Sequence, residues 1–141
     1  MMKKKLSEYI WIIICIMMFM PIIGMCVYFF RENIQLKTAK SSYEKGTEII
    51  TGVLKNETEE VLYYKNSFLL EHYSNGKWSE TREAPFDLIG KLPMVLPGEE
   101  VSISFYVCIL SPLQTEGKYR IGQKVYIGDE ERIIYAVFSV D

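Results

Sequence analysis

The sequence contains very little cysteine and histidine. Its 141 residues include three cysteines and one histidine. Cys15 and Cys26 lie in a long apolar stretch near the N-terminus, which leaves Cys108 alone in the rest of the chain and excludes a disulfide there. A histidine-rich metal centre needs several histidines, and His72 is the only one. We therefore expect no metal or cofactor site, and a domain that is stabilised by burial of apolar side chains alone.

Positive charge is scarce outside the N-terminal part of the chain. Residues 1–40 carry six basic and two acidic side chains, whereas the remainder carries ten basic and sixteen acidic ones. A net-acidic domain without a basic patch cannot displace counterions from phosphates, which argues against nucleic acid as a partner. The basic N-terminal end suits the anionic headgroups of a lipid bilayer instead.

The longest feature present is an uncharged apolar run from Tyr9 to Phe30. A helix needs about 20 apolar residues to cross the hydrocarbon core of a bilayer. We therefore expect residues 9–30 to form an uncleaved transmembrane anchor that follows a basic cytoplasmic tail, residues 1–8. Lysines at positions 3–5 favour a cytoplasmic N-terminus, so a single-pass protein of the cell membrane with an extracytoplasmic C-terminal domain is predicted.

Two other fates of this segment stay open. A cleaved signal peptide would have a shorter apolar region and small residues before the cleavage site, and no such triplet follows the run. A lipoprotein signal would place a lipid on Cys26, but Met25 is larger than the small residue wanted before that cysteine. The anchor is the favoured interpretation, and a lipoprotein modified at Cys26 is an alternative.

A different pattern follows the apolar run. Residues 31–46 are predicted to be a polar stalk, and residues 47–141 to be one domain of short strands. Val101–Cys108 alternates apolar and polar side chains, which is typical of a half-buried antiparallel strand. Asn75-Gly76 between two β-prone runs predicts a tight hairpin. About seven short strands and no helix of three turns predict an all-β, antiparallel sandwich.

The remaining segments of the domain fit this pattern. Asn56-Glu57-Thr58 matches a glycosylation sequon, but a turn is the favoured interpretation. A loop that contains Phe86 and Leu88 is expected to cross between the sheets, and Met94–Leu96 to be a short edge segment. The other strands are expected at Thr47–Lys55, Glu60–Tyr64, Ser67–Tyr73, Lys118–Ile127 and Arg132–Val140.

Four short motifs follow one another along this domain: Asn75-Gly76-Lys77-Trp78, Leu96–Val101, Gly117–Arg120 and Tyr135–Phe138. In this order they resemble a family of bacterial immunoglobulin-like (Ig-like) domains. Members occur in small membrane-anchored proteins and lipoproteins, mostly of Gram-positive bacteria. The resemblance implies an Ig-like sandwich over residues 47–141 and an extracytoplasmic location, and it implies no reaction.

The third motif contains a tyrosine with a specific expected role. Tyr119 resembles the tyrosine corner of Greek-key sandwiches, in which a tyrosine near the start of a strand bonds to the backbone upstream. Ile121 stands where an antibody domain has its second cysteine, in agreement with the missing disulfide. Trp78 is expected to be a core residue.

Catalytic chemistry has few candidates in this sequence. His72 and Cys108 are the only residues that could form a nucleophile pair, and both are expected in strand interiors without an orienting acid. A structural role is favoured for both, so no catalytic residue is assigned and no enzyme activity is expected. Two acidic clusters lack the alternating ligand spacing of a calcium loop and are interpreted as solvated hairpin tips: Glu57, Glu59 and Glu60, and Asp129, Glu130 and Glu131.

Tyrosine is unusually common on the expected strand faces. Tyr63, Tyr64, Tyr73 and Tyr106 would make an adhesive surface, although tyrosine is also a good strand former. The sequence thus favours a membrane-anchored extracytoplasmic Ig-like binding module that meets a protein or cell-envelope partner. The alternatives are an enzyme on the same fold, and an accessory or sensor subunit of a membrane complex that acts through its transmembrane helix.

Overall fold

The computed structural model describes residues 34–79, 82–84, 91–110 and 113–141 of the chain. The predicted tail and anchor, residues 1–8 and 9–30, lie outside these residues, as do Phe86 and Leu88 of the predicted crossing loop. No helix within the described ranges is long and apolar enough to cross a membrane.

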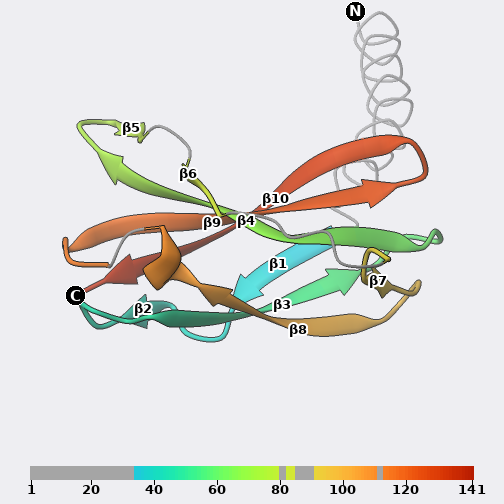
Figure 1. Cartoon of the computed structure of the whole chain (residues 1–141), viewed down its shortest axis with the longest axis horizontal. Coiled ribbons are helices and arrows are strands. Elements are labelled where there is room, and N and C mark those ends of the chain that lie inside the picture. Colours follow the sequence, from blue (N-terminus) through green and yellow to red (C-terminus); the bar gives the residue numbers. More distant parts are fainter. Residues whose placement is uncertain (1–33, 80–81, 85–90, 111–112) are drawn as a thin grey trace, which may run out of the picture. The chain divides into compact units, whose positions relative to one another are not determined.

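The described residues form two sheets of β-strands, which Figure 1 shows as two layers. The first sheet has the order β1 (Ile34–Thr38), β3 (Ile49–Asn56), β8 (Glu100–Tyr106). The second has the order β2 (Ser42–Tyr43), β10 (Glu130–Val140), β9 (Gly117–Ile127), β4 (Leu62–Ser74), β5 (Lys77–Trp78). Both β6 (Arg82–Glu83) and β7 (Met94–Val95) also pair with β4. The prediction of an all-β sandwich is confirmed, but the described residues form ten strands instead of about seven, and β2 pairs with β10 in parallel instead of antiparallel.

Three long antiparallel strands make up most of the second sheet. β9 pairs with β10 along its whole length and with β4 on its other side. The loop between β9 and β10 contains Gly128 at φ 53°, as the predicted hairpin requires. β4 is one strand where the sequence predicted two. A register shift between Tyr64 and Phe68 accommodates the polar residues between them as a bulge, so the strand bends without ending.

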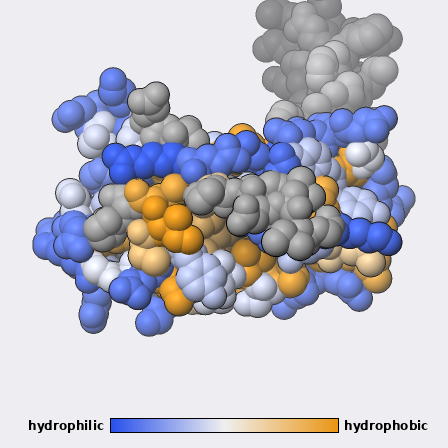
Figure 2. Space-filling view, viewed as in Figure 1, coloured by the Kyte–Doolittle hydropathy of each residue, from blue (hydrophilic) through white to orange (hydrophobic). Residues whose placement is uncertain are grey.

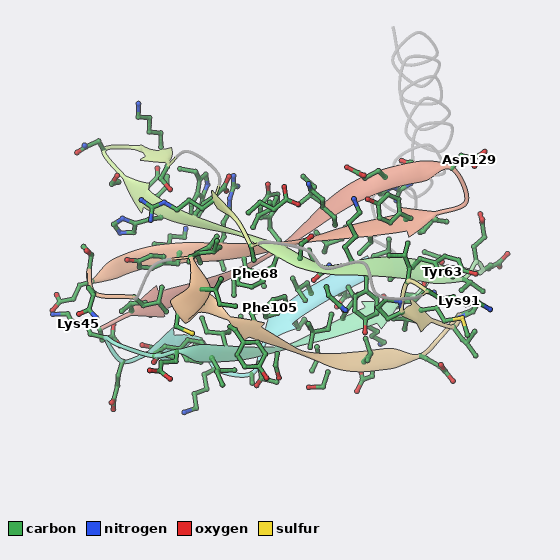
Figure 3. All side chains as sticks on the ribbon, viewed as in Figure 1. Lys45, Tyr63, Phe68, Lys91, Phe105 and Asp129 are labelled. Carbon is green, nitrogen blue, oxygen red and sulfur yellow. The ribbon has the colours of Figure 1, made fainter. Side chains whose placement is uncertain are left out.

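Alternating side chains of β8 supply part of the core. Phe105 is 1% exposed, whereas Ser102 and Ser104 face solvent. The Phe105 ring meets the ring of Phe68 from β4 edge to face, with 5.4 Å between centroids, and Figure 3 shows the two rings between the layers. The predicted half-buried antiparallel strand is confirmed, except at its end. Cys108 lies in a short 3-10 turn, η1 (Val107–Ile109), and is exposed.

Two predicted turns are confirmed. Asn75 and Gly76 have φ angles of 51° and 76°, which are the positive values that a type I′ turn needs at both central positions. Asn56 is fully buried, and its side-chain oxygen accepts a hydrogen bond from the Thr58 backbone N–H at 3.0 Å. Its amide nitrogen donates to the carbonyl oxygens of Glu60 (2.8 Å) and Val95 (3.0 Å), which fixes this turn and excludes a glycan on the folded domain.

The predicted stalk is wrong for residues 34–46, because they belong to the sandwich. β1 pairs with β3, and β2 pairs with the end of β10. Ile34 and Leu36 are 2% and 6% exposed, and Tyr43 is 9% exposed. In the sequence, β1 shows only two apolar residues two positions apart, Ile34 and Leu36. An alternation of this length is too short to identify a strand. The described part of the domain therefore begins at Ile34, and only three positions of the sequence lie between Ile34 and the end of the apolar run at Phe30.

Tyr119 forms the predicted corner. Its hydroxyl donates a hydrogen bond to the carbonyl oxygen of Thr115 at 2.8 Å. Its ring, 7% exposed, stacks between His72 and Phe138 with centroid distances of 4.4 and 5.7 Å. Burial raises the pKa of the Tyr119 phenol, and the bond to Thr115 lowers that pKa in part. Ile121 is fully buried, as a core residue in place of a cysteine would be.

Trp78, by contrast, is not a core residue. It is half-buried on β5, a two-residue strand that pairs with the end of β4. Tyr73 is its partner across the hairpin, and the two rings meet at a centroid distance of 5.1 Å. Few side chains of the core reach the end of the β4–β5 hairpin, so the Trp78 indole packs along the sheet instead of into the core.

Candidate interaction surface

The outward face of the β4, β9 and β10 strands holds the most distinctive side-chain cluster of the described domain. Strand alternation directs Ile121, Ala136 and Phe138 into the core, where all are 5% exposed or less. The residues between them on β9 and β10 point to the opposite face. We call this face of β4, β5, β9 and β10 the outer face.

Arg120 lies at the centre of the outer face. Its guanidinium carbon is 4.3 Å from the ring centroid of Trp78 and 4.1 Å from that of Tyr135, so the cation is held between two aromatic rings. The guanidinium also donates a hydrogen bond to Glu71, whose side chain is 5% exposed. Register places Glu71 directly opposite Arg120 on the neighbouring strand. The cluster is thus an ion pair between a buried carboxylate and a partly buried guanidinium that is held between two aromatic rings.

Gly122 makes this arrangement possible. A Cβ atom at Gly122 would lie 2.8 Å from a ring carbon of Tyr135 and 3.0 Å from a methyl carbon of Ile133. The first distance is shorter than real Cβ contacts and the second is tighter than most of them, so a side chain at position 122 would push the Tyr135 ring away from β9. Glycine therefore sets the position of one of the two rings that hold Arg120.

Apolar and aromatic area remains open around this cluster. Ile133, Tyr135 and Val137 on β10 are 39%, 36% and 49% exposed. On the other side of β9, Tyr73 is 41% exposed, and the Lys118 ammonium lies 5.8 Å from its ring centroid. Figure 2 views the domain from the side, so the outer face is not turned toward the reader, and the hydrophobic residues seen there lie mainly between the two layers. Rigid rings beside open aliphatic side chains suit a protein-binding surface.

The four tyrosines proposed from the sequence do not form one surface. Tyr64 is 9% exposed and belongs to the core. Tyr106 is half exposed on β8, in the other sheet. Tyr63 and Tyr73 are both exposed on β4, but they pair with opposite ends of β9, at Tyr126 and Lys118. Only Tyr73 joins the cluster.

The prediction from the number of tyrosines missed the residues that do form the surface. Trp78, Arg120 and Tyr135 come from three strands, and the sequence contains no motif that joins them. The available signal is weak: Lys118, Arg120 and Gly122 alternate with buried residues along β9, which identifies them as outward but not as neighbours of Trp78.

The candidate nucleophile pair is not assembled. His72 lies on β4 and stacks on the Tyr119 ring, whereas Cys108 lies in η1, after β8 of the other sheet. Within the described residues no hydrogen bond joins these two side chains. His72 has the structural role that was favoured from the sequence, and Cys108 is an exposed thiol rather than a strand-interior residue.

The two acidic clusters converge at one end of the domain. Glu57, Glu60 and Glu130 line the same open depression, about 530 Å³ in volume, together with Arg132. In the part of the chain that the structure describes, no three histidine, cysteine, aspartate or glutamate side chains are placed so that they could hold a metal ion together. Glu57 pairs with Lys55 at 2.8 Å and Glu130 with Arg132 at 2.8 Å. The Arg132 hydrogen bond lowers the pKa of the Glu130 carboxyl, as expected for an exposed ion pair.

Comparison with solved structures gives distant matches. One is a structural-genomics target, SoR45: 15% sequence identity, TM-score 0.51, with 77% of this chain and 85% of that chain covered. A second is Spo0M, a sporulation control protein from Bacillus subtilis: 16% identity, TM-score 0.45, covering 77% of this chain and 49% of that one. A third is the DNA glycosylase AlkC from Pseudomonas fluorescens: 12% identity, TM-score 0.41, covering 77% of this chain and 30% of that one.

At such identities the first of these matches supports the fold alone, and the chain spans less than a third of AlkC. A search of curated proteins found no match. The family comparison is more informative. The model of the family described as "Bacterial Ig-like domain" matches residues 31–138, and so includes β1 and β2 along with the later strands. With the two-layer sandwich and the tyrosine corner, this match shows that the chain belongs to the bacterial Ig-like domain family.

Proposed function

We propose that this protein is a membrane-anchored extracytoplasmic binding module, which holds its Ig-like domain close to the membrane and binds a protein or cell-envelope partner through the outer face. The observation that carries the proposal is the outer face itself, where a braced Trp78–Arg120–Tyr135 cluster adjoins exposed aliphatic side chains. The uncharged run ending at Phe30, three residues before β1, supports the membrane anchor.

A binding role agrees with the chemistry of the described residues. Ig-like domains typically bind rather than catalyse, and the candidate nucleophile pair is separated, with His72 on β4 and Cys108 in η1 after β8 of the other sheet. On the outer face Arg120 and Lys124 are paired with Glu71 and Glu83 in a net-acidic protein, so this face offers little of the free positive charge that nucleic acid requires.

Protease treatment of intact cells tests the location. Cells that make the full chain with an N-terminal epitope tag are exposed to an added protease. We expect the domain to be digested and the tagged tail to be protected. A domain that is digested only after the cells are lysed would contradict the extracytoplasmic location.

Site-specific photo-cross-linking in the same cells tests the binding face. A photo-reactive side chain at Val137 probes the outer face, and one at Ser102, exposed on the other sheet, is the matched control. We expect a discrete cross-linked species from position 137 that is absent from position 102 and is lost on adding Ile133→Glu. Equal labelling from both positions, or none from either, would contradict binding through the outer face.

The intact mass of the purified protein separates the anchor from the lipoprotein. We expect the mass of the unprocessed chain, 16.5 kDa. A chain shortened to begin at Cys26 and carrying lipid would overturn the transmembrane anchor. It would leave the domain on the membrane, with residues 27–33 as its link.

A further inference from the structure

Strand β10 has an edge that is only partly paired. The backbone N–H of Ser139 donates to the Ser41 carbonyl at 2.9 Å, and that of Asp141 donates to the Tyr43 carbonyl at 3.0 Å. These bonds run to β2, away from β9. Because backbone groups alternate along a strand, the N–H and C=O groups of Val137, Tyr135 and Ile133 point toward the same edge.

No described strand pairs with that edge along Ile133–Val137. β2 pairs only with Ser139 and Val140. Three alternate residues, Ile133, Tyr135 and Val137, therefore present outward N–H and C=O groups along this edge. The stretch from Ile133 to Val137 is long enough to pair with an added strand of four or five residues. Exposed edges of this kind are templates for pairing with another chain.

An open depression of about 310 Å³ adjoins this edge. It lies between β10 and the second half of β1 with the chain that follows it, and it is lined by Leu36, Lys37, Thr38, Lys40, Ser41 and Tyr135–Val137. We call this depression with the edge of Ile133–Val137 the β10 groove. An added strand needs such space beside the sheet for its own backbone and for every second side chain.

The charge of the β10 groove differs from that of the domain. Lys37 and Lys40 are exposed at its rim, and neither forms an ion pair with another described residue. Lys45, Lys55 and Lys124 pair with glutamates at distances of 2.5 to 2.8 Å, whereas Lys77 and Lys91 form no ion pair with another described residue, so the groove is set apart by holding two such lysines beside a backbone edge. Two lysines without a carboxylate partner at a backbone edge complement an acidic chain.

The geometry points to an occupant of the β10 groove: an extended, acidic peptide segment of a partner protein, which adds to β10 as a further strand. Its backbone bonds to Ile133, Tyr135 and Val137, and its carboxylates meet Lys37 and Lys40. The inference deepens the proposed function, on which it rests, by naming the chemistry of the partner.

Defined peptides test this without knowledge of the natural partner. The probe is an eight-residue peptide that alternates valine and glutamate, added to the full chain in detergent micelles. We expect amide exchange at residues 133, 135 and 137 to slow at least about tenfold when the peptide binds. A peptide with lysine in place of glutamate, and the glutamate peptide with N-methylated amides, are expected to bind at least about tenfold more weakly.

Two variants locate the contact. Tyr135→Pro removes an N–H that faces the open edge and leaves the bonds to β9 in place, and it should abolish the protection. Ser104→Pro, at the edge of the other sheet, is its matched control. If Tyr135→Pro does not fold, Lys37→Glu with Lys40→Glu replaces it, and Lys77→Glu at the distant hairpin is the control. The double variant should weaken binding about tenfold and the control should not.

Several results would overturn the inference. Equal binding of the lysine peptide, protection elsewhere than β10, or no protection by millimolar glutamate peptide each excludes it. Protection that appears without peptide as protein concentration rises would make a second copy of this chain the occupant. The peptide assay needs neither a cell nor the natural partner, so it fails or succeeds independently of the cross-linking experiment. If Val137 cross-links to a partner in cells but the peptide gives no protection, strand addition at the β10 groove is wrong and the proposed function stands. If the peptide protects residues 133, 135 and 137 but no cross-linked species forms in cells, the proposed function is wrong and the peptide-binding property of the groove stands.

Discussion

The hydroxyl group of Tyr119 ties the chain before β9 to the sandwich through the Thr115 carbonyl. Tyr119→Phe removes this hydrogen bond and keeps the ring between His72 and Phe138. We expect the free energy of unfolding to fall by about 1 kcal/mol. The matched control, Tyr106→Phe at a half-exposed tyrosine, should change it by less than about 0.5 kcal/mol. Urea unfolding measures both, and equal losses would contradict a special role for the corner.

Arg120 neutralises a carboxylate that is almost inaccessible to water. Arg120→Ala removes the guanidinium from beside the buried Glu71 carboxylate, so we expect a loss of about 3 kcal/mol in the free energy of unfolding. Replacing both residues by leucine removes the charges together and should restore much of that loss. Thermal and urea unfolding of the single and double variants measure this. A loss below about 1 kcal/mol for Arg120→Ala would contradict this role of the ion pair.

The role of a single residue could be predicted where it depends on residues close to it in the sequence. Tyr119 and the Asn75-Gly76 turn were predictable because each depends on neighbours within a few positions of the chain. The contacts of Trp78 with Arg120 were not, because they depend on the register of β5, β4 and β9 across the sheet. Register is set by the whole hydrophobic pattern and by the bulge in β4, which one sequence does not reveal.

Strand β1 is an integral part of the sandwich. Ile34 and Leu36 are buried, and each such side chain contributes about 1.5–3 kcal/mol when fully removed from water. A domain has only about 5–15 kcal/mol of stability in total. We therefore expect residues 31–141 to unfold cooperatively, and residues 41–141 to be unfolded or far less stable. Circular dichroism melts of the two fragments measure this. Equal melting temperatures would show that β1 is dispensable.

An ion pair between Glu83 and Lys124 joins β6 to β9 across β4. The Lys124 hydrogen bond, and a weaker one from Ser67, lower the pKa of the Glu83 carboxyl. A lowered pKa stabilises the folded state above the ordinary glutamate pKa, and this stabilisation is lost as pH falls through the folded-state pKa. We expect Glu83→Gln to cost less than about 1 kcal/mol at pH 7 because the pair is exposed.

Thermal unfolding of the wild-type chain and Glu83→Gln between pH 7 and pH 3 checks this. The two melting temperatures should converge as the carboxyl becomes protonated in both states. A difference that grows toward acid pH would contradict the sign of the pKa shift.

Long periodic elements were predictable and short ones were not. Residues 101–107 and 118–127 alternate strongly, so β8 and β9 could be placed within a residue or two. β1, β2 and β6 have five residues or fewer and exist because a neighbouring strand pairs with them. The pairing is a tertiary effect, and intrinsic strand preference is too weak to reveal it.

The domain has two chemically different ends. Ile34 at the start of β1 pairs with Asn56, beside the turn that carries Glu57, Glu59 and Glu60. The loop with Asp129 lies at this same end, and Lys45 lies at the other, as Figure 3 shows. Residues 31–33 span at most about 10 Å. If residues 9–30 cross the membrane as proposed, this short link predicts that the acidic end is nearer the bilayer than the end that carries Lys45.

Fluorescence quenching tests this orientation. A dye is attached to Glu59→Cys or, as the control, to Lys77→Cys on the opposite hairpin, in a chain without its three native cysteines. In vesicles that contain headgroup-labelled nitroxide lipid, we expect the dye at position 59 to be quenched more than the dye at position 77. A fifteen-residue insertion after Phe30 should reduce the difference. Equal quenching of both dyes would contradict a short link.

The positions of β1 and β10 also govern how the domain carries mechanical load. β1 starts at one end of the sandwich, and β10 finishes at the opposite end. Tension between these two points runs along the strands, so the bonds between β1 and β3 are loaded in shear. They must rupture together instead of opening one after another from an end. For a membrane-anchored binding module of the kind proposed above, we therefore expect this strand geometry to keep the domain folded when the bound partner is pulled away from the membrane.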